Sequence, residues 1–257
     1  MALTMVGTRL EQSVTPTALR SYLAEFISTF LFVFASVGST ISSRKLMPNA
    51  VPDPSSLVAI AIANAFALSS TVYMAANISG GHVNPAVTFG MAIGGHISVP
   101  TAMIYWVAQL LASTVACLLL NIVATIVGQV IPTHAIAEEM TGFGAAVVEG
   151  VITFALVYAF YAAGDARRGQ VGVIGPLVIG LIVGANTLAA APFTGGSMNP
   201  ACSFGLALVS GNFKNQGVYW AGPLIGAAIA GLVYDNVMFP SQSSDASRFM
   251  VDGGVGQ

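Results

Sequence analysis

Two short segments of the chain carry the side chains best placed to do chemistry. Residues 80–90 (GGHVNPAVTFG) and 195–205 (GGSMNPACSFG) share a Gly-Gly start, an Asn-Pro-Ala triplet and a Phe-Gly end. Proline is favoured at the first position of a helix, because the N–H that it lacks would have no partner there. Each triplet therefore predicts a helix start whose asparagine is the N-cap. The triplets are Asn84-Pro85-Ala86 and Asn199-Pro200-Ala201.

Such a helix start has an electrostatic consequence. Each asparagine can accept hydrogen bonds from the free N–H groups of its own helix, and we expect its amide NH2 to point into a lumen. The N-terminus of a helix carries partial positive charge. Two such ends facing each other would repel cations and protons while donating hydrogen bonds to a neutral molecule. One copy is most simply a helix start, but two copies in matching surroundings indicate a shared role.

Two further pairs of segments match at nearly the same offset. Residues 24–30 (AEFISTF) resemble 148–154 (VEGVITF), and Tyr105-Trp106 resembles Tyr219-Trp220. The chain is therefore predicted to contain two homologous halves of three membrane spans each. Because three is odd, the second half starts on the opposite side of the membrane, and the halves are inverted repeats. The Asn-Pro-Ala segments then enter from opposite faces as re-entrant half-helices that meet near the midplane.

The composition indicates a membrane protein. Of 257 residues, 55% are hydrophobic and 7% are charged, whereas about 25% of a soluble domain is charged. A net charge of -2 and two scattered cysteines argue against a nucleic-acid binder and a disulfide scaffold. The predicted fold is all-α, with two half-helices near 78–95 and 193–212 and six transmembrane helices near 21–41, 57–76, 102–127, 143–163, 171–191 and 217–238.

The domain organisation follows from these spans. Residues 21–238 are predicted to form one channel domain, with repeat one at about 21–127 and repeat two at about 143–238. The placement of Lys and Arg predicts that the N-terminal segment 1–20 and the C-terminal tail 239–257 are both cytosolic. The short Arg167-Arg168 loop is the strongest element in this bias, and the inner side also holds Arg9, Arg20 and Arg248.

Glu25 and Glu149 are acidic residues placed well inside predicted spans. A carboxylate within a membrane bundle is paired or functional. In a secondary transporter built on inverted repeats, the two would be relay groups; in a passive channel, they would accept N–H bonds that brace the re-entrant loops. Their symmetric placement favours bracing. We predict no enzymatic activity, no cofactor and no metal site, because no catalytic or metal-ligating set of side chains is evident.

These motifs resemble the aquaporin (major intrinsic protein) family, from about Ser21 to Asp235. Residues 80–90 and 180–186 (GLIVGAN) further resemble plant tonoplast intrinsic proteins, with the divergent fifth subgroup most similar. The resemblance implies the aquaporin fold and a homotetramer of independently conducting pores. It also implies a multi-pass location in membrane lipid, in the plant vacuolar membrane.

The resemblance also implies a selectivity filter, formed here by Asn64, Thr187, Gly196 and Cys202. Water-selective relatives place an aromatic residue or His at the first position and Arg at the last. With Cys202 in place of Arg, the filter loses a full charge and a bulky side chain. We expect a wider mouth in which Asn64 and Thr187 lie beside Phe66 or Leu188. It would pass water and small neutral solutes including urea, with boric acid, ammonia, glycerol and hydrogen peroxide as further candidates.

Two histidines accompany these motifs. His82 precedes the first Asn-Pro-Ala triplet, and we expect it to pack at the cytosolic vestibule. His134 matches a loop position that approaches the constriction in some relatives. A titratable histidine at a mouth without the filter Arg would supply pH-dependent charge, although an exposed loop residue of no special role is the simpler interpretation.

Overall fold

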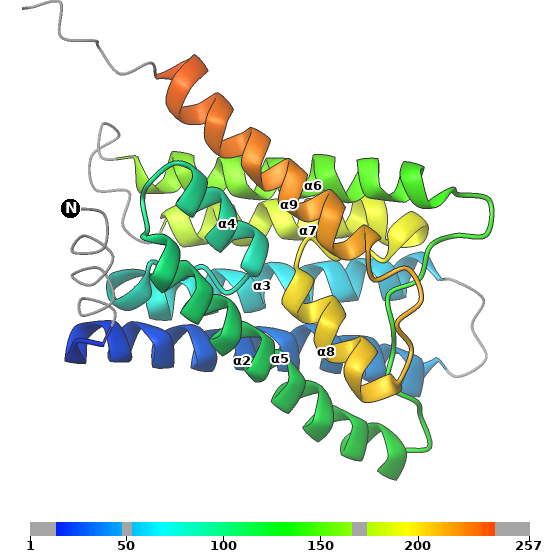
Figure 1. Ribbon diagram of the computed structural model, residues 1–257. Coiled ribbons are helices and arrows are strands. Elements are labelled where there is room, and N and C mark those ends of the chain that lie inside the picture. Colours follow the sequence, from blue (N-terminus) through cyan, green and yellow to red (C-terminus); the bar gives the residue numbers. More distant parts are fainter. Residues whose placement is uncertain (1–13, 48–52, 166–173, 240–257) are drawn as a thin grey trace, which may run out of the picture.

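The fold is a bundle of helices that matches the predicted architecture (Figure 1). The computed structural model describes residues 14–47, 53–165 and 174–239. Within these ranges six helices are long and apolar enough to cross a membrane. They are α2 (Pro16–Leu46), α3 (Pro54–Ser79), α5 (Val99–Ile126), α6 (Gly142–Gly164), α7 (Ile174–Thr194) and α9 (Val218–Leu232), which the π-helix η2 (Val233–Met238) extends. The expected all-α membrane fold is confirmed.

Two shorter helices lie between the long ones. They are α4 (Pro85–Ile93) and α8 (Pro200–Ser210), and they fall within the two segments predicted to be re-entrant. In Figure 1, α4 and α8 occupy opposite ends of the gap between α5 and α9, with their N-terminal ends toward the middle of the bundle. Two half-helices thus approach one level of the molecule from opposite sides.

The helices begin where capping chemistry allows. Thr15, Asp53 and Thr141 each accept a hydrogen bond from a first-turn N–H of α2, α3 and α6, respectively. Because Pro16 follows the Thr15 cap, α2 starts five residues before the predicted span and also continues to Leu46. At the other end of the chain, the last six residues of the predicted sixth span form a π-helix.

Glycines allow the long helices to approach closely. A Cβ on Gly226 of α9 would overlap the carbonyl oxygen of Gly150 on α6, and a Cβ on Gly180 of α7 would overlap that of Ala65 on α3. Small residues permit such backbone contact between membrane helices. The closest-packed pairs are therefore α6 with α9 and α3 with α7.

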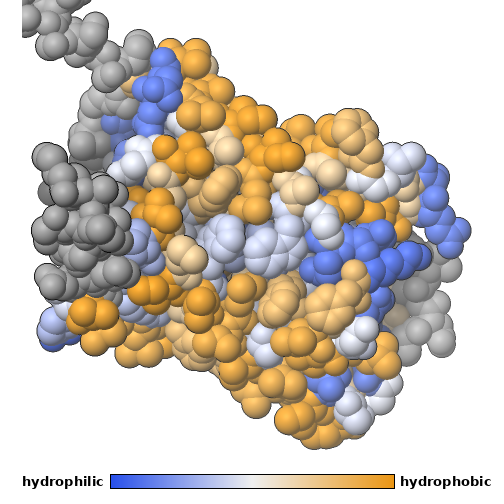
Figure 2. All heavy atoms as spheres, viewed as in Figure 1, coloured by the Kyte–Doolittle hydropathy of each residue, from blue (hydrophilic) through white to orange (hydrophobic). Residues whose placement is uncertain are grey.

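The outside of the bundle is suited to lipid. Figure 2 shows hydrophobic residues over the sides and the more hydrophilic ones gathered toward the ends. Large apolar side chains are exposed along every long helix, including Leu23, Ile62, Met103, Val151, Leu181 and Ile225. The protein is thus an integral, multi-pass membrane protein. Arg9, Arg167, Arg168 and Arg248, on which the orientation depends, lie outside the described residues, as do most of segments 1–20 and 239–257.

Candidate pore and constriction

The two asparagines cap the half-helices. Asn84 Oδ1 accepts from the Ala86 N–H at 2.8 Å, and Asn199 Oδ1 accepts from the Ala201 N–H at 3.0 Å. Proline occupies the first helical position in both cases. Each side-chain oxygen is therefore held by its own helix, which fixes the direction of the amide nitrogen.

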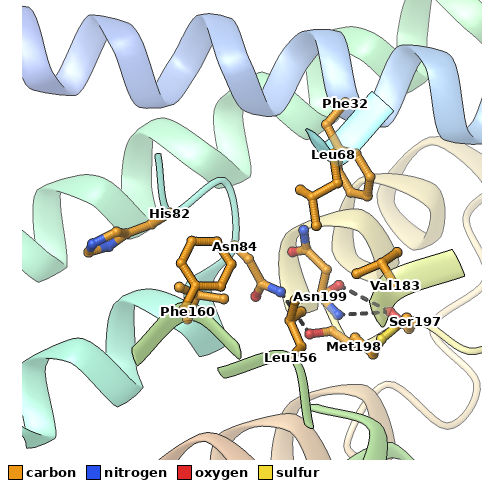
Figure 3. Close-up of a pocket in the computed structure, with 11 residues that line it drawn as sticks. Phe32, Leu68, His82, Asn84, Leu156, Phe160, Val183, Ser197, Met198 and Asn199 are labelled. Carbon is orange, nitrogen blue, oxygen red and sulfur yellow. Dashed lines mark hydrogen bonds between the residues drawn. The ribbon is translucent and has the colours of Figure 1, made fainter. Parts of the chain in front are cut away.

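The amide nitrogens cross between the two halves of the chain. Asn84 Nδ2 donates to the Met198 carbonyl at 2.8 Å, and Asn199 Nδ2 donates to the Val83 carbonyl at 3.0 Å. We expected each NH2 to face the lumen; instead one N–H of each binds the opposite loop. Figure 3 shows the two side chains directed toward each other.

The backbone of both loops has unusual torsion angles at the residues that accept these bonds. Val83 and Met198 have φ angles of 57° and 54°, a left-handed conformation that is uncommon for residues other than glycine. Both residues donate their own N–H to a buried glutamate, and these bonds help to hold the loops in the strained conformation. Backbone outliers at two matching positions indicate a functional site.

Glu25 accepts four hydrogen bonds around the first loop. Its donors are Ser79 Oγ at 2.6 Å, the His82 N–H at 2.8 Å, the Val83 N–H at 2.7 Å and Gln109 Nε2 at 2.8 Å. The side chain is fully buried. A buried charge is tolerated when every lone pair is used in this way.

Glu149 has the same place in the second half but fewer partners. It accepts from Thr194 Oγ1 at 2.7 Å and from the N–H groups of Ser197 and Met198 at 2.9 and 2.8 Å. In the first half, Gln109 supplies the extra donor and also donates to Thr88 Oγ1. Gln109, Ser79 and Thr194 were missed by sequence reasoning, because a lone polar residue in an apolar helix has no recognisable spacing.

Between the asparagines runs a narrow passage. The cavity there has a volume of about 10 Å³, on the scale of one water position. Asn84, Asn199, His82 and Ser197 contribute its polar groups, and its apolar wall includes Phe32, Leu68, Val87, Leu156, Phe160 and Val183. A molecule here meets the asparagine amides together with hydrocarbon side chains around them (Figure 3).

A wider vestibule of about 560 Å³ opens on the side where α2 ends. The four proposed filter residues all line it: Asn64, Thr187, Gly196 and Cys202. Asn64 Nδ2 donates to Thr187 Oγ1 at 3.2 Å, and Thr187 in turn donates to the Val183 carbonyl. Asn64 Oδ1 has no hydrogen-bond partner in the described structure. This oxygen is buried, so it is an unsatisfied acceptor within the wall of the constriction.

The expected apolar neighbours of the filter were wrong. Phe66 and Leu188 are 64% and 45% exposed on the outside of the bundle. Phe66 follows Asn64 by two residues and Leu188 follows Thr187 by one. Neighbouring positions on a helix point in different directions. The apolar groups of this vestibule are instead Phe32, Val183 and Leu206, with Met198 at its base.

The two histidines occupy different parts of the pore. His82 lies buried in the central passage, with Nδ1 3.1 Å from Thr88 Oγ1 and its ring edge-on to Tyr105. It is therefore deeper than the vestibule position that we expected. His134 lines the wide vestibule, with Nδ1 2.9 Å from Ser203 Oγ.

His134 also contacts Gly195 of the second loop and the ring of Tyr219. This burial lowers the pKa of the His134 imidazole to about 4. The ring is therefore neutral at physiological pH, and it gains charge only when the pH falls toward 4. Arg44 lies in the last turn of α2 and lines the same vestibule.

Comparison with known proteins agrees with this geometry. The family model of major intrinsic proteins matches residues 12–234. The chain belongs to this family. The probable aquaporin TIP5-1 of Arabidopsis thaliana is 57% identical over 95% of this chain and 94% of its own length. Aquaporin TIP2-1 of the same plant is 56% identical over 90% of this chain and 92% of its own length.

A solved structure supports the fold. The aquaglyceroporin from Plasmodium falciparum superposes with a TM-score of 0.78 at 22% identity, covering 86% of this chain and 97% of that one. For this member of the major intrinsic protein family, the six-helix arrangement with two half-helices is therefore the aquaporin fold.

The two cysteines of this major intrinsic protein allow a matched test of the pore wall. Cys202 lines the vestibule, whereas Cys117 is fully buried on α5. We expect a small mercurial to lower solute flux by about tenfold or more, because the bound metal narrows the vestibule beside Asn64 and Thr187. Cys202→Ser should conduct and resist the reagent, and Cys117→Ser should remain sensitive. Stopped-flow light scattering measures both; protection by Cys117→Ser instead would place the reactive thiol elsewhere.

Proposed function

We propose that the protein is a passive channel for water and small neutral solutes, including urea. The observation that supports this most is the pair of opposed, amide-capped half-helices at a passage with room for about one water. Helix N-termini and asparagine amides present only donors and partial positive charge there. A neutral molecule that accepts hydrogen bonds can replace its lost hydration, while a cation or proton meets a barrier.

The constriction supports passage of solutes larger than water. Gly196 contributes no side chain and Cys202 a small, uncharged one, and both lie in the wall of the vestibule. Thr187 and Asn64 contribute a hydroxyl and an amide, which bind each other at this constriction. Urea, ammonia, boric acid, glycerol and hydrogen peroxide all match this chemistry, because each is neutral and can both donate and accept hydrogen bonds.

The contacts of the buried glutamates weigh against the transporter alternative. A relay group needs a lone pair or proton that is exchanged with the pathway. The Glu25 and Glu149 oxygens instead accept from loop N–H groups and from Ser79, Gln109 and Thr194. The two carboxylates also lie outside the set of residues that lines the central passage. We infer that they brace the two loops.

Location and assembly are part of the same proposal. The similarity to tonoplast intrinsic proteins supports a place in the vacuolar membrane with both termini in the cytosol. On that orientation the wide vestibule faces the vacuolar lumen. The exposed apolar sides of α2, α3, α6 and α7 are available for packing four copies into a homotetramer.

Reconstitution into liposomes tests the function directly. We expect water and urea permeability to rise at least about fivefold over empty liposomes, with no ionic current, because the amide-capped passage passes neutral molecules only. Stopped-flow swelling measures the fluxes, and planar-bilayer recording measures the current. Liposomes that hold the Asn84→Asp variant provide a control, since a carboxylate at that cap weakens the barrier to cations. A steady proton or potassium conductance that scales with the amount of native protein would contradict the proposal.

A further inference from the structure

A histidine, an aspartate and a tyrosine meet on the side of the molecule opposite the vestibule, where α4 ends (Figure 1). His96 Nε2 lies 3.0 Å from Asp235 Oδ2. The His96 ring is edge-on to Tyr161 at 5.1 Å between centroids, and the Tyr161 hydroxyl donates to the Gly90 carbonyl at 2.8 Å. This group joins the loop after α4 to α6 and to η2.

His96 is fixed to the last turn of α4 by its own backbone. The His96 N–H donates to the Met91 carbonyl at 2.9 Å, and the Gly94 N–H donates to the Gly90 carbonyl at 3.1 Å. Position 94 has no room for a larger residue, because a Cβ on Gly94 would overlap the Tyr161 hydroxyl and lie 2.6 Å from Asp235 Oδ2. A force on the His96 ring therefore acts on the end of α4.

The other end of α4 carries Asn84. The helix has nine residues and is about 13 Å long. It is packed so closely that a Cβ on Gly90 would lie 3.1 Å from the Ala227 carbonyl of α9. Because a helix this short moves as a unit, its position at the His96 end sets the position of Asn84 at the pore centre.

The partner side chain comes from an unusual helix. Asp235 lies in η2, a π-helix, and such segments are rare and concentrated at functional sites. The neighbouring Tyr234 is buried and donates to Asp165 Oδ2 at 2.7 Å. The ionisable groups around the His96 ring are thus Asp235 from η2 and Tyr161 from α6, with Asp165 behind Tyr234. His96 and Asp235 lie within ion-pair distance, and the contact is an ion pair only when the histidine is protonated.

We propose that His96 and Asp235 form a pH-dependent latch that positions α4, and with it Asn84, and so regulates the channel from this side. Histidine changes charge between about pH 5 and 8. Protonation turns a neutral hydrogen bond into a charge-assisted one, which is stronger. The side chains are 45% and 31% exposed, so solvent limits the bias to about two- to fivefold between latched and unlatched states. The inference rests on the proposed channel function.

Permeability as a function of pH tests the latch. The latched arrangement is the one in which both asparagine amides bind the opposite loop, so we expect it to conduct better. Water permeability of the wild type should be about 1.5- to 2-fold higher at pH 5.5 than at pH 7.5. His96→Lys carries a permanent charge and should hold the higher level at both pH values. His96→Gln and Asp235→Asn should hold the lower level at both.

His134→Gln is the matched control, because His134 lies in the vestibule on the opposite side and should leave the pH response intact. Gly94→Ala keeps every titratable group but wedges the latch open, so it should flatten the response. A flat profile in conducting wild type, or a pH response that survives in His96→Gln and is lost in His134→Gln, would overturn the latch.

Thermal unfolding in detergent gives a reading that does not depend on conduction. Asp235→Asn should lower the melting temperature by about 1–3 °C more at pH 5.5 than at pH 7.5, and in a His96→Gln background this pH difference should disappear. If wild-type liposomes pass no water at any pH, the proposed channel function fails, and the melting data still decide the latch. An equal effect of Asp235→Asn at both pH values would show that the pair does not respond to pH.

Discussion

Replacing Cys202 with arginine is expected to cut urea flux about tenfold while cutting water flux only about twofold, since each ~1.4 kcal/mol added to a barrier lowers a rate tenfold. The thiol lines the vestibule beside Asn64 and Thr187. A guanidinium there narrows the opening and adds a fixed positive charge beside Asn64 and Thr187. Water needs less width than urea, so the larger solute loses more.

Parallel stopped-flow measurements on the same liposome preparations give the ratio of the two fluxes. Cys202→Ser is the matched control, because it keeps the size of the side chain and should leave both fluxes near the wild-type level. Equal reduction of water and urea flux by Cys202→Arg would place the constriction at another level of the pore.

The second large effect concerns Glu25 and Glu149, the two buried glutamates that bind the loops. Glu25→Gln should lower the free energy of unfolding by about 3–5 kcal/mol, because an amide NH2 then faces donors where an anion accepted them. Glu25 accepts four hydrogen bonds and Glu149 accepts three. Glu149→Gln should therefore cost less, by about 1 kcal/mol.

Chemical or thermal unfolding of the purified variants in one detergent compares the two losses. Gln109→Leu is an intermediate case, because it removes only the fourth donor of Glu25. It should lower the free energy of unfolding by less than Glu25→Gln does. If Glu149→Gln proves the more damaging of the two substitutions, the number of donors is not what sets the stability of these loops.

Sequence reasoning reached the fold because the strongest signals were local and repeated. A span of apolar residues predicts a membrane helix without knowledge of its neighbours, and Pro85 and Pro200 mark helix starts by their own chemistry. The matching halves then supplied the arrangement, since an odd number of spans requires inversion. The family comparison and the fold comparison confirm that architecture.

The parts that were missed depend on direction in space. The crossed bonds from Asn84 to Met198 and from Asn199 to Val83 join residues that are more than a hundred positions apart. No local pattern specifies which way an amide turns. Phe66 and Leu188 failed for the same reason, because adjacency along a helix says little about which side chain faces the pore. The π-helix at Val233–Met238 lies at the end of the predicted sixth span, where the sequence fits an α-helix equally well.

The crossed amide bonds have a consequence for how the chain is made. The ribosome completes the first half before Met198 exists, so the first loop must wait in the membrane with its Asn84 amide lacking its final partner. The Val83 carbonyl likewise has to wait for Asn199. Neither loop can reach its finished geometry alone, and insertion of the last three long helices becomes the event that completes both at once.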